Sequence, residues 1–421
     1  MSEARPRILV VSPIPLFPST AGGPARIVGY LRYFRDAGFE VHLAITRRKQ
    51  SERQELEALV DHLHLYNPKK NGGDRKGKNS PRSPRSSLKR AARFLLVDLR
   101  HGIRRAKYER RFLPRRFQPS HIERLRVVDF DAFVGKVARK TRPQAVIANF
   151  VWTAGGVNDV PPNALTMIDT HDIQHLRAKA GKEAGYDLSR IQVSRKEECR
   201  ELKRADILLA IQSEEMEILR TMCPDSRIML FEHGVPIPER EATPEDLMEV
   251  LFIANHYEPN IEGIKAFIEL AWPTIRKQHP KCRLTVCGRV CKALEPELPG
   301  VDLMGIVPEL ESYYRRASIV INPVPFGTGL KIKTVEALVH AKCLITTDWG
   351  ITGLPVPGED APEYCVVRAI GDMAEPVIEL LADVPRRVAI EEEALALACE
   401  RFSPEGAYGE LAALIRKVPT Y

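Results

Sequence analysis

Two lysines and a glutamate stand close together in the stretch PFGTGLKIKTVEAL, residues 325–338. A helix that begins near Ile332 would add the positive end of its dipole to the charges of Lys331 and Lys333, which favours an anion such as phosphate. Glu336 follows inside this helix, where its carboxylate can accept hydrogen bonds from the hydroxyls of a ribose. The alternative is an ordinary connection between a strand and a helix, with the lysines in solvent.

The turn before these lysines contains Gly327, Thr328 and Gly329. Glycine permits positive φ and a close approach of the backbone to a ligand, and Thr328 can donate a hydroxyl hydrogen bond. Consecutive amides in such a turn form a concavity that suits phosphate oxygens. We therefore expect the segment to bind a phosphorylated ligand.

A second glycine turn, in STAGGPAR, places Gly22 and Gly23 between an apolar strand and a helix. It is not the GxGxxG of dinucleotide-binding loops, and a plain turn is the alternative. Two such turns at the carboxyl ends of strands in facing domains could hold one ligand from both sides.

The segment DTHDIQH, residues 169–175, follows another buried strand and offers His171 and Asp172. His171 could accept a proton or orient a sugar hydroxyl. In the alternative interpretation, Asp172 caps the next helix and His171 is only packed.

The sequence predicts no metal site and no cofactor. Cys282, Cys287 and Cys291 lack the CxxC spacing of structural zinc sites. Asp129 and Asp131 have the spacing of a metal-binding DxD pair, but they begin an amphipathic helix, so we expect them to be partners of the helix dipole.

Buried apolar strands alternate with helices along both halves of the chain. The expected strands are 8–11, 41–45, 145–150, 164–172, 206–212 and 227–235 in the first half, and 249–255, 282–288, 301–307, 318–324 and 342–348 in the second. Helices are expected at 260–278 and 309–317. Uninterrupted apolar strands are typical of parallel sheets that are covered on both faces. We predict an α/β protein with two doubly wound, Rossmann-like domains facing each other across a cleft.

The chain of 421 residues exceeds the about 250 to 300 residues at which one hydrophobic core stops growing. The predicted organisation is a first domain (1–235), a proline-rich linker (236–247), a second domain (248–395) and a helical segment (396–421) that can cross back to the first domain.

The net charge of +8 originates in one segment of the first domain, residues 69–118. This basic insert has 18 lysines and arginines against Asp74, Asp98 and Glu109. Residues 88–117 place apolar side chains on one helical stripe bordered by basic ones, which suits an anionic membrane surface. A helix packed on its own domain is the alternative. Few aromatic residues are present to stack on bases, which argues against nucleic acid as a partner.

The chain has no uncharged apolar run long enough to span a membrane and no signal peptide at its start. Its cysteines are scattered, as in proteins of a reducing compartment. We expect a cytoplasmic protein that can associate peripherally with the inner face of the membrane.

Two longer stretches resemble a known family. FIAN…EPNIEGIKAFIELAWPTIRKQHP…LTVCGR, followed by INPVPFGTGLKIKTVEALVHAKCLITTDWGITGLP, resembles the donor-binding half of GT-B glycosyltransferases of family 4, the glycosyl transferases group 1. The segment SPIPLFPSTAGGPARIVGYLRYFRDAGFEVHL resembles their acceptor half. The resemblance implies transfer of a sugar from a nucleotide-diphosphate donor, with retained anomeric configuration and without an essential metal.

The resemblance also implies where the donor binds. Glu336 would hold the ribose hydroxyls, and Gly22 and Gly23 would approach the diphosphate. Ile306 and Val307 would border the base.

Further roles follow from the same resemblance. His171 would lie near the transferred sugar, and Arg289 with Lys331 or Lys333 would neutralise the leaving diphosphate. The family commonly has Arg and Lys on the loop after the first strand of the donor domain, where this chain has Asn255, His256, Glu258 and Asn260. The resemblance therefore implies that Arg289, Lys331 and Lys333 supply the positive charge that this loop lacks.

One departure concerns the sugar. The family often has a glutamate eight residues before the ribose glutamate, where this chain has Thr328. The identity of the sugar is therefore left open.

We expect a glycosyltransferase that acts on a glycan or a lipid-linked saccharide. One alternative is a nucleotide-sugar epimerase or hydrolase of the same fold. The other is a non-enzymatic protein whose basic insert binds an anionic surface or a nucleic acid.

Overall fold

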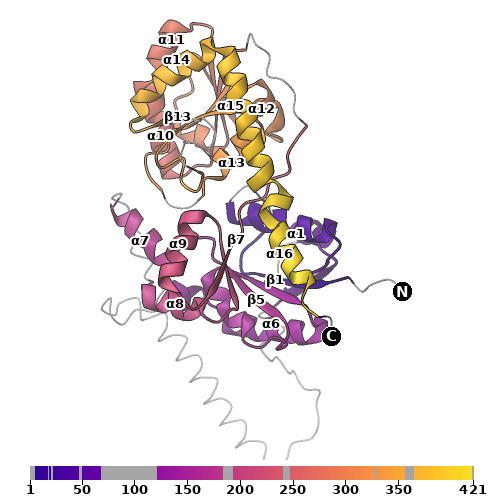
Figure 1. Cartoon of the computed structure of the whole chain (residues 1–421). Coiled ribbons are helices and arrows are strands. Elements are labelled where there is room, and N and C mark those ends of the chain that lie inside the picture. Colours follow the sequence, from indigo (N-terminus) through magenta and orange to yellow (C-terminus); the bar gives the residue numbers. More distant parts are fainter. Residues whose placement is uncertain are drawn as a thin grey trace, which may run out of the picture.

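The computed structural model describes residues 5–17, 19, 22–46, 50–67, 121–183, 193–239, 247–327, 330–355 and 365–419. The basic insert, residues 88–117 included, lies outside the described residues, as do Thr328, Gly329 and most of the predicted linker. The described part of the chain forms two lobes, each built around a parallel β-sheet (Figure 1).

The first sheet has seven parallel strands in the order β3-β2-β1-β4-β5-β6-β7. Its strands are β1 (Arg7–Ser12), β2 (Glu40–Thr46), β3 (His62–Tyr66), β4 (Ala145–Asn149), β5 (Leu165–Asp169), β6 (Ile207–Ala210) and β7 (Arg227–Leu230). Its helices are α1 (Gly22–Asp36), α2 (Gln50–Leu59), α5 (His121–Leu125), α6 (Val128–Thr141), α7 (Gln174–Glu183), α8 (Arg195–Leu202) and α9 (Ser213–Met222), with the 3₁₀ helix η3 (Val151–Val157). The central strands are buried on both faces, as the uninterrupted apolar runs predict.

The second sheet has six parallel strands in the order β10-β9-β8-β11-β12-β13, which repeats the 3-2-1-4-5-6 order of dinucleotide-binding folds. Its strands are β8 (Glu249–Ile253), β9 (Arg283–Cys287), β10 (Val301–Gly305), β11 (Ile319–Asn322), β12 (Cys343–Thr347) and β13 (Cys365–Val367). Its helices are α10 (Glu258–Leu270), α11 (Trp272–Gln278), α12 (Glu311–Arg316), α13 (Ile332–Val339), α14 (Ala374–Ala382) and α15 (Val384–Leu397), with η4 (Arg289–Ala293) and η5 (Ile370–Met373). The predicted fold of two doubly wound α/β domains is thereby confirmed.

The single helix expected at 260–278 is wrong, because α10 ends at Leu270 and α11 begins at Trp272. Pro273 lies in the first turn of α11. It lacks the amide hydrogen that a continuous helix would need, so it fits only where a helix starts.

The chain returns to the first lobe at its end. The π-helical turn η6 (Ala398–Phe402) follows α15, and α16 (Pro404–Arg416) then runs beside α1 (Figure 1). The buried Tyr408 hydroxyl accepts a hydrogen bond of 2.8 Å from the amide of Gly234, and the Arg416 guanidinium donates to the carbonyl of Ala37. Helix α16 therefore fastens the end of the second lobe to the first.

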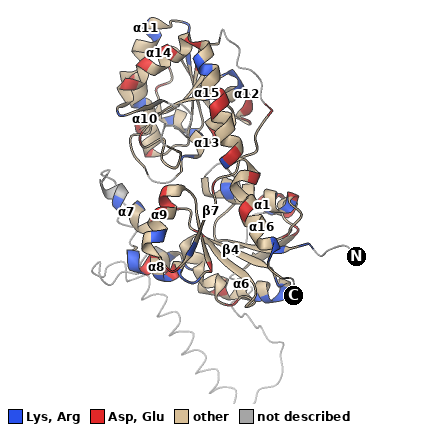
Figure 2. Cartoon of the chain, in the orientation of Figure 1, with Lys and Arg blue, Asp and Glu red and all other residues tan. Residues whose placement is uncertain are grey.

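Lysine, arginine, aspartate and glutamate are interspersed on the outer helices of both lobes, for example on α8 and α15 (Figure 2). Asp129 and Asp131 lie in the first turn of α6, as predicted, and Asp131 pairs with Arg126 at 2.9 Å.

Candidate functional site at the carboxyl ends of both sheets

The predicted phosphate segment follows β11, at the carboxyl edge of the second sheet. Gly327 has φ of +133°, a conformation that side chains disfavour. Lys331 caps the start of α13, whose buried face of Thr334, Val335, Ala337, Leu338 and Val339 packs on the second domain. This packing holds the amides of the first turn of α13 at the edge of the sheet, where they can donate hydrogen bonds to an anion.

Glu336 is half-buried one turn inside α13. The Tyr314 hydroxyl donates a hydrogen bond of 3.3 Å to its Oε2 atom, and His340 stacks on the Tyr314 ring with centroids 4.1 Å apart. Burial raises the pKa of Glu336 to about 7, although Tyr314 and Lys333 oppose that shift. One oxygen of the carboxylate thus remains available to accept hydrogen bonds from a ligand.

Lys333 is held by neutral groups. Its ammonium donates a hydrogen bond to Oδ1 of Asn260 and lies 5.0 Å from the centroid of the Phe252 ring. Within the described residues no carboxylate lies within ion-pair distance of its Nζ atom. Burial, and next the charge of Lys331, lower the pKa of Lys333 to about 7. A buried ammonium with neutral partners is stabilised when an anion binds beside it.

Lys331 faces the first domain. Its pKa is lowered to about 8 by burial, while Asp172, Glu214 and Glu215 of the first domain act on it in the opposite direction. A Cβ atom on Gly327 would lie 3.5 Å from its Nζ atom, so the lysine lies back over the glycine turn. Lys331 is therefore shared between the phosphate segment and the acidic groups of the opposite domain.

His171 lies opposite, just beyond the carboxyl end of β5. Its Nε2 atom is 2.8 Å from Oδ1 of Asn149, which also accepts a hydrogen bond of 2.9 Å from the hydroxyl of Tyr30. The Nδ2 amide of Asn149 donates to the carbonyl of Val11, which fixes Oδ1 as the acceptor. His171 must then carry its proton on Nε2, leaving the Nδ1 lone pair as an acceptor.

The surroundings of His171 keep it neutral and in a strained conformation. Burial lowers the pKa of His171 to about 4; the nearby carboxylate of Asp169 opposes this shift, and the charge of Arg26 adds to it. The φ of His171 is +60° and that of Phe150, on which its ring stacks at 4.0 Å, is +70°. Strained residues concentrate at functional sites, since the surrounding structure must offset their cost.

The first-domain glycine turn lies against both His171 and the second domain. A Cβ atom on Gly23 would lie 3.8 Å from Nδ1 of His171, and one on Gly22 would lie 2.9 Å from Cδ1 of Ile332. The first turns of α1 and α13 therefore approach each other across the two domains. The structure brings Gly22, Gly23 and His171 close to Gly327 and residues 330–336.

Asp172 lies at the same edge. Its carboxylate is 3.3 Å from NH1 of Arg177, and burial raises its pKa. The sequence interpretation missed Glu215 and Gln212, which follow β6. Burial, and next the charge of Asp172, raise the pKa of the Glu215 carboxyl to about 8. Gln212 meets the second domain, since a Cβ atom on Gly353 would lie 2.2 Å from its Oε1 atom. Their position directly after an apolar strand is the signal that could have found them.

Buried side-chain atoms without a hydrogen-bond partner gather at these strand ends. Among the described residues there are six such atoms, and five of them lie at or shortly after the end of a strand: Gln174 Oε1, Gln212 Oε1, Glu215 Oε2, His233 Nδ1 and Asn322 Oδ1. Unpaired buried polar atoms are costly, so this edge suits a polar ligand with its ordered water.

A different set of groups holds the strand ends in place. Arg26 of α1 makes a bidentate ion pair with Asp169, with distances of 3.0 and 3.1 Å, and donates to the carbonyls of Phe231 and Glu232. Both side chains are fully buried. This clamp joins α1, β5 and the end of β7 beneath His171.

The remaining predicted site residues follow strands of the second sheet. Arg289 begins η4, just after β9, and is exposed. The Ile306 side chain is 66% exposed, whereas Val307 packs on the apolar cluster that contains Val335.

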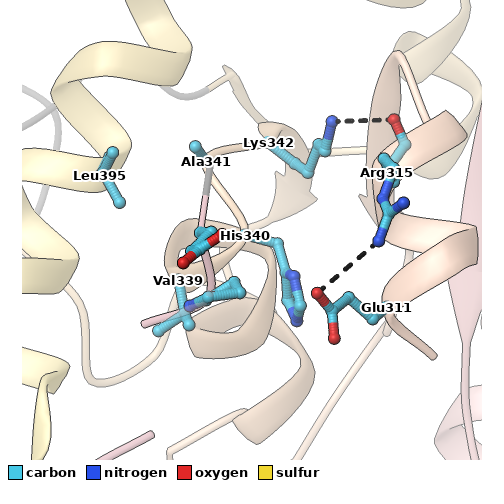
Figure 3. Close-up of a pocket in the computed structure, with 9 residues that line it drawn as sticks. Glu311, Arg315, Val339, His340, Ala341, Lys342 and Leu395 are labelled. Atoms are coloured by element: carbon cyan, nitrogen blue, oxygen red, sulfur yellow. Dashed lines mark hydrogen bonds and ion pairs between the residues drawn. The ribbon is translucent and has the colours of Figure 1, made fainter. Parts of the chain in front are cut away.

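A pocket of the second domain lies away from this edge (Figure 3). Its wall includes Glu311 and Arg315, whose side chains are 3.8 Å apart, together with His340 and Lys342. Lys342 directly precedes β12, so the pocket lies at the amino ends of the strands. Rossmann-like sheets bind their ligands at the opposite, carboxyl edge.

Residues 248–383 match the family described as Glycosyl transferases group 1. Over 116 residues the chain is 26% identical to an uncharacterized 44.6 kDa protein in the cps region of Klebsiella pneumoniae. That match covers 25% of this chain and 30% of the relative, so it spans less than a third of the relative's length.

Solved structures are similar over nearly the whole chain. HepE of Anabaena, in complex with UDP and glucose, has a TM-score of 0.60 at 12% identity and covers 98% of this chain and 100% of its own. Sucrose-phosphate synthase of Thermosynechococcus elongatus has a TM-score of 0.65 at 14% identity, with coverages of 98% and 99%. A mutant of S. aureus TarM, in complex with Fondaparinux, alpha-GlcNAc-glycerol and UDP, has a TM-score of 0.62 at 11% identity, with coverages of 98% and 100%.

At these identities the likeness to solved structures shows the fold alone. The family match concerns residues 248–383 of the second domain. None of the helices in the described residues is long and apolar enough to cross a membrane. Three observations indicate the same fold. They are the strand orders of the two sheets, the position of the polar groups at the carboxyl edge, and the family match over residues 248–383. The chain has the GT-B fold of glycosyltransferases, and residues 248–383 match the family described as Glycosyl transferases group 1.

Proposed function

We propose that the protein transfers a sugar from a nucleoside-diphosphate donor to an acceptor at the edge where the two domains meet. The observation that carries this proposal is the grouping of Lys331, Lys333, Glu336 and the first turn of α13 opposite His171 and Gly23. This group combines cations, helix amides and a carboxylate in one place, which is the chemistry that a diphosphate linked to a ribose requires.

In this proposal the diphosphate binds at the start of α13. Lys333 has the neutral partners Asn260 and Phe252, so an arriving anion does not have to displace a carboxylate from it. Glu336 lies one turn further into the helix and accepts hydrogen bonds from the ribose hydroxyls. Its raised pKa means that the carboxylate is only partly charged near neutral pH until hydroxyl donors bind to it.

His171 would serve the transferred sugar. Its Nδ1 lone pair faces the Gly23 turn, and its Nε2 proton is engaged by Asn149. A neutral imidazole that is fixed in this tautomer can accept a hydrogen bond from a sugar hydroxyl. Because burial lowers the pKa of His171 to about 4, it keeps this role over a wide pH range.

The bond that breaks joins the anomeric carbon to a diphosphate oxygen, and negative charge grows on the departing diphosphate. Lysines and helix amides that are already in place stabilise that charge, by about 3 to 4 kcal/mol for each donor by analogy with oxyanion holes. Lys331, Lys333 and the turn at Gly327 would carry this role. Independence of a metal and retention of anomeric configuration belong to the proposal.

The acceptor in this proposal is a glycan or a lipid-linked saccharide. The S. aureus TarM mutant was crystallised with Fondaparinux and alpha-GlcNAc-glycerol, which supports a saccharide acceptor for this fold. Contact with an anionic membrane through residues 88–117 stays a prediction. Vesicle sedimentation of a variant with reversed charges at Arg100, Arg104 and Arg111 tests it, because unchanged binding would contradict the membrane contact.

The experiment is a donor screen. The purified protein is incubated with UDP-, GDP-, ADP- and dTDP-sugars, with and without a chelator, while binding and nucleotide release are followed. We expect saturable binding of at least one donor that survives the chelator, and weaker binding in Glu336→Gln but not in the exposed control Glu297→Gln. Absence of binding by every donor would contradict the proposal. Conversion of the sugar without nucleotide release would indicate an epimerase.

A further inference from the structure

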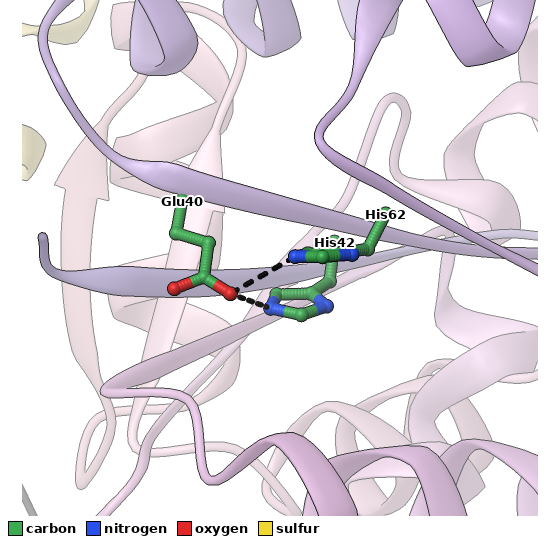
Figure 4. Close-up of side chains that lie close together, drawn as sticks. All are labelled: Glu40, His42 and His62. Carbon is green, nitrogen blue, oxygen red and sulfur yellow. Dashed lines mark hydrogen bonds and ion pairs between the residues drawn. The ribbon is translucent and has the colours of Figure 1, made fainter.

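Three side chains of β2 and β3 converge on one point outside the proposed donor site (Figure 4). Oε1 of Glu40 lies 3.2 Å from Nε2 of His42 and 3.1 Å from Nε2 of His62. One potential ligand atom from each residue lies within 4.8 Å of the others. We refer to Glu40, His42 and His62 as the histidine cluster.

The backbone places these side chains together. Strands β2 and β3 are parallel neighbours, and His42 pairs with His62 in their register, so both imidazoles leave the same face of the sheet. Glu40 precedes His42 by two residues on the same strand and therefore shares that face. The two rings stack with centroids 4.5 Å apart.

We propose that the histidine cluster binds one divalent transition-metal ion, and that zinc is the cation that suits it best. Zinc takes imidazole nitrogen and carboxylate oxygen at about 2.0 to 2.2 Å, which puts the ligand atoms of a tetrahedral site about 3.3 Å apart. The distances of 3.1 and 3.2 Å from Glu40 Oε1 to the two nitrogens are close to that value. Mixed nitrogen and oxygen ligands favour zinc over magnesium or calcium.

Two neighbouring residues, His64 and Arg7, orient the proposed ligands. Nδ1 of His42 is 3.1 Å from Nε2 of His64, so that with Nε2 on the metal the Nδ1 hydrogen is donated to His64. Such a second hydrogen bond fixes the tautomer of a metal-bound histidine. Nε of Arg7 lies 3.6 Å from Oε2 of Glu40 and holds that oxygen away from the two imidazoles.

The cluster also has a free side. The side chain of His62 is 51% exposed and that of Glu40 is 29% exposed, whereas His42 is buried. Water can therefore reach the cation and complete a tetrahedral set of ligands. Sites with three protein ligands and one water are well known for zinc.

The position of the cluster separates it from the donor site. Glu40 and His62 are the first residues of their strands, whereas the donor groups lie at the carboxyl ends. A bound ion would tie the edge strand β3 to β2. It would stabilise the first domain without taking part in glycosyl transfer.

The test uses the whole protein, purified without a polyhistidine tag, stripped with a chelator and titrated with Zn²⁺ by calorimetry. We expect one ion per chain, and an affinity at least about 100-fold lower in His62→Ala, which removes a ligand. His64→Gln should weaken binding by about 10- to 100-fold, because it alters only the second hydrogen bond of His42. His256→Ala, which removes an exposed imidazole elsewhere, should leave the affinity unchanged.

A second measurement covers the case in which a variant folds poorly. The Co²⁺-loaded protein should show the visible absorption of a tetrahedral cobalt site, and this absorption should disappear in His62→Asn, which keeps a polar side chain at a largely exposed position. Absence of saturable Zn²⁺ binding, or equal affinity in wild type and His62→Ala, would overturn the proposal. Neither outcome would bear on nucleotide-sugar binding, which is measured separately in the presence of chelator.

Discussion

The two domains repeat one strand order, yet Arg26 of the first domain and Lys333 of the second are held by opposite kinds of partner. In the first domain, Arg26 is paired through two hydrogen bonds with Asp169. In the second, the partners of Lys333 are the amide of Asn260 and the ring of Phe252. Burial disfavours the charged form of both side chains. Asp169 offsets this effect for Arg26, whose pKa is raised, whereas the pKa of Lys333 is lowered to about 7.

This difference separates structural from functional charge. A buried cation that has a carboxylate partner is already satisfied and serves the fold. A buried cation with neutral partners gains most of its stabilisation from a ligand anion. We infer that the buried charge of Arg26 holds the strand ends of the first domain, while the charge of Lys333 in the second domain is kept for the diphosphate.

The largest expected effect comes from breaking the structural pair. Arg26→Ala leaves the buried Asp169 carboxylate without its charged partner, which should lower the free energy of unfolding by about 3 to 5 kcal/mol. Urea denaturation followed by circular dichroism measures this. Adding Asp169→Asn should recover part of the loss, and a single variant as stable as wild type would contradict the role given to the clamp.

Removing the ammonium of Lys333 should lower activity and leave stability unchanged. Lys333→Ala should lower kcat/KM for the donor by about 10²- to 10³-fold, because a stabilising donor to the leaving diphosphate is lost. Its melting temperature should not fall, since a buried charge with neutral partners is removed. The matched control is Lys265→Ala, an exposed lysine of α10. Equal activity of the two variants would remove Lys333 from the site.

A substitution at Glu336 tests where the ribose binds in the second domain. Glu336→Gln should weaken binding of a nucleoside diphosphate by about 10- to 100-fold, the range for hydrogen bonds to a charged group. A 2′-deoxyribose analogue should bind wild type more weakly than the ribose form, and the variant should distinguish the two less. Equal discrimination by both proteins would place the ribose elsewhere.

A further prediction concerns pH. As the pH rises, Lys333 and Lys331 lose their protons near about 7 and about 8 in the free protein, while a bound diphosphate favours the charged forms. Affinity for a nucleoside diphosphate should therefore fall with rising pH, by up to about tenfold per unit for each lysine. Glu336 acts in the opposite direction, because its carboxyl charges as the pH rises through about 7. Calorimetric titrations between about pH 6 and 9 test this, and Lys333→Arg should flatten the decline.

The sequence predicted most strands of the two sheets well, because long apolar runs mark buried parallel strands. It missed β3, with its sequence HLHLY, and the three-residue β13, since neither carries such a run. The glycine turns and Lys331, Lys333 and Glu336 could be found because they are neighbours along the chain.

Groups that come together only through folding were not predictable in the same way. Asn149 fixes the tautomer of His171 from 22 residues away, and Tyr30 reaches Asn149 across 119 residues. The pairing of Arg26 with Asp169 spans 143 residues. No local pattern carries these contacts, although Asn149 and Asp169 are each the last residue of a strand at the same edge.

The most direct test of the account is a crystal structure with an intact nucleotide sugar. It predicts the diphosphate against the first turn of α13, within hydrogen-bond distance of Lys331 or Lys333. The ribose hydroxyls should lie on Glu336, and the sugar should lie between Thr328 and His171. A nucleotide bound in the pocket beside His340, or anywhere away from α13, would contradict the account.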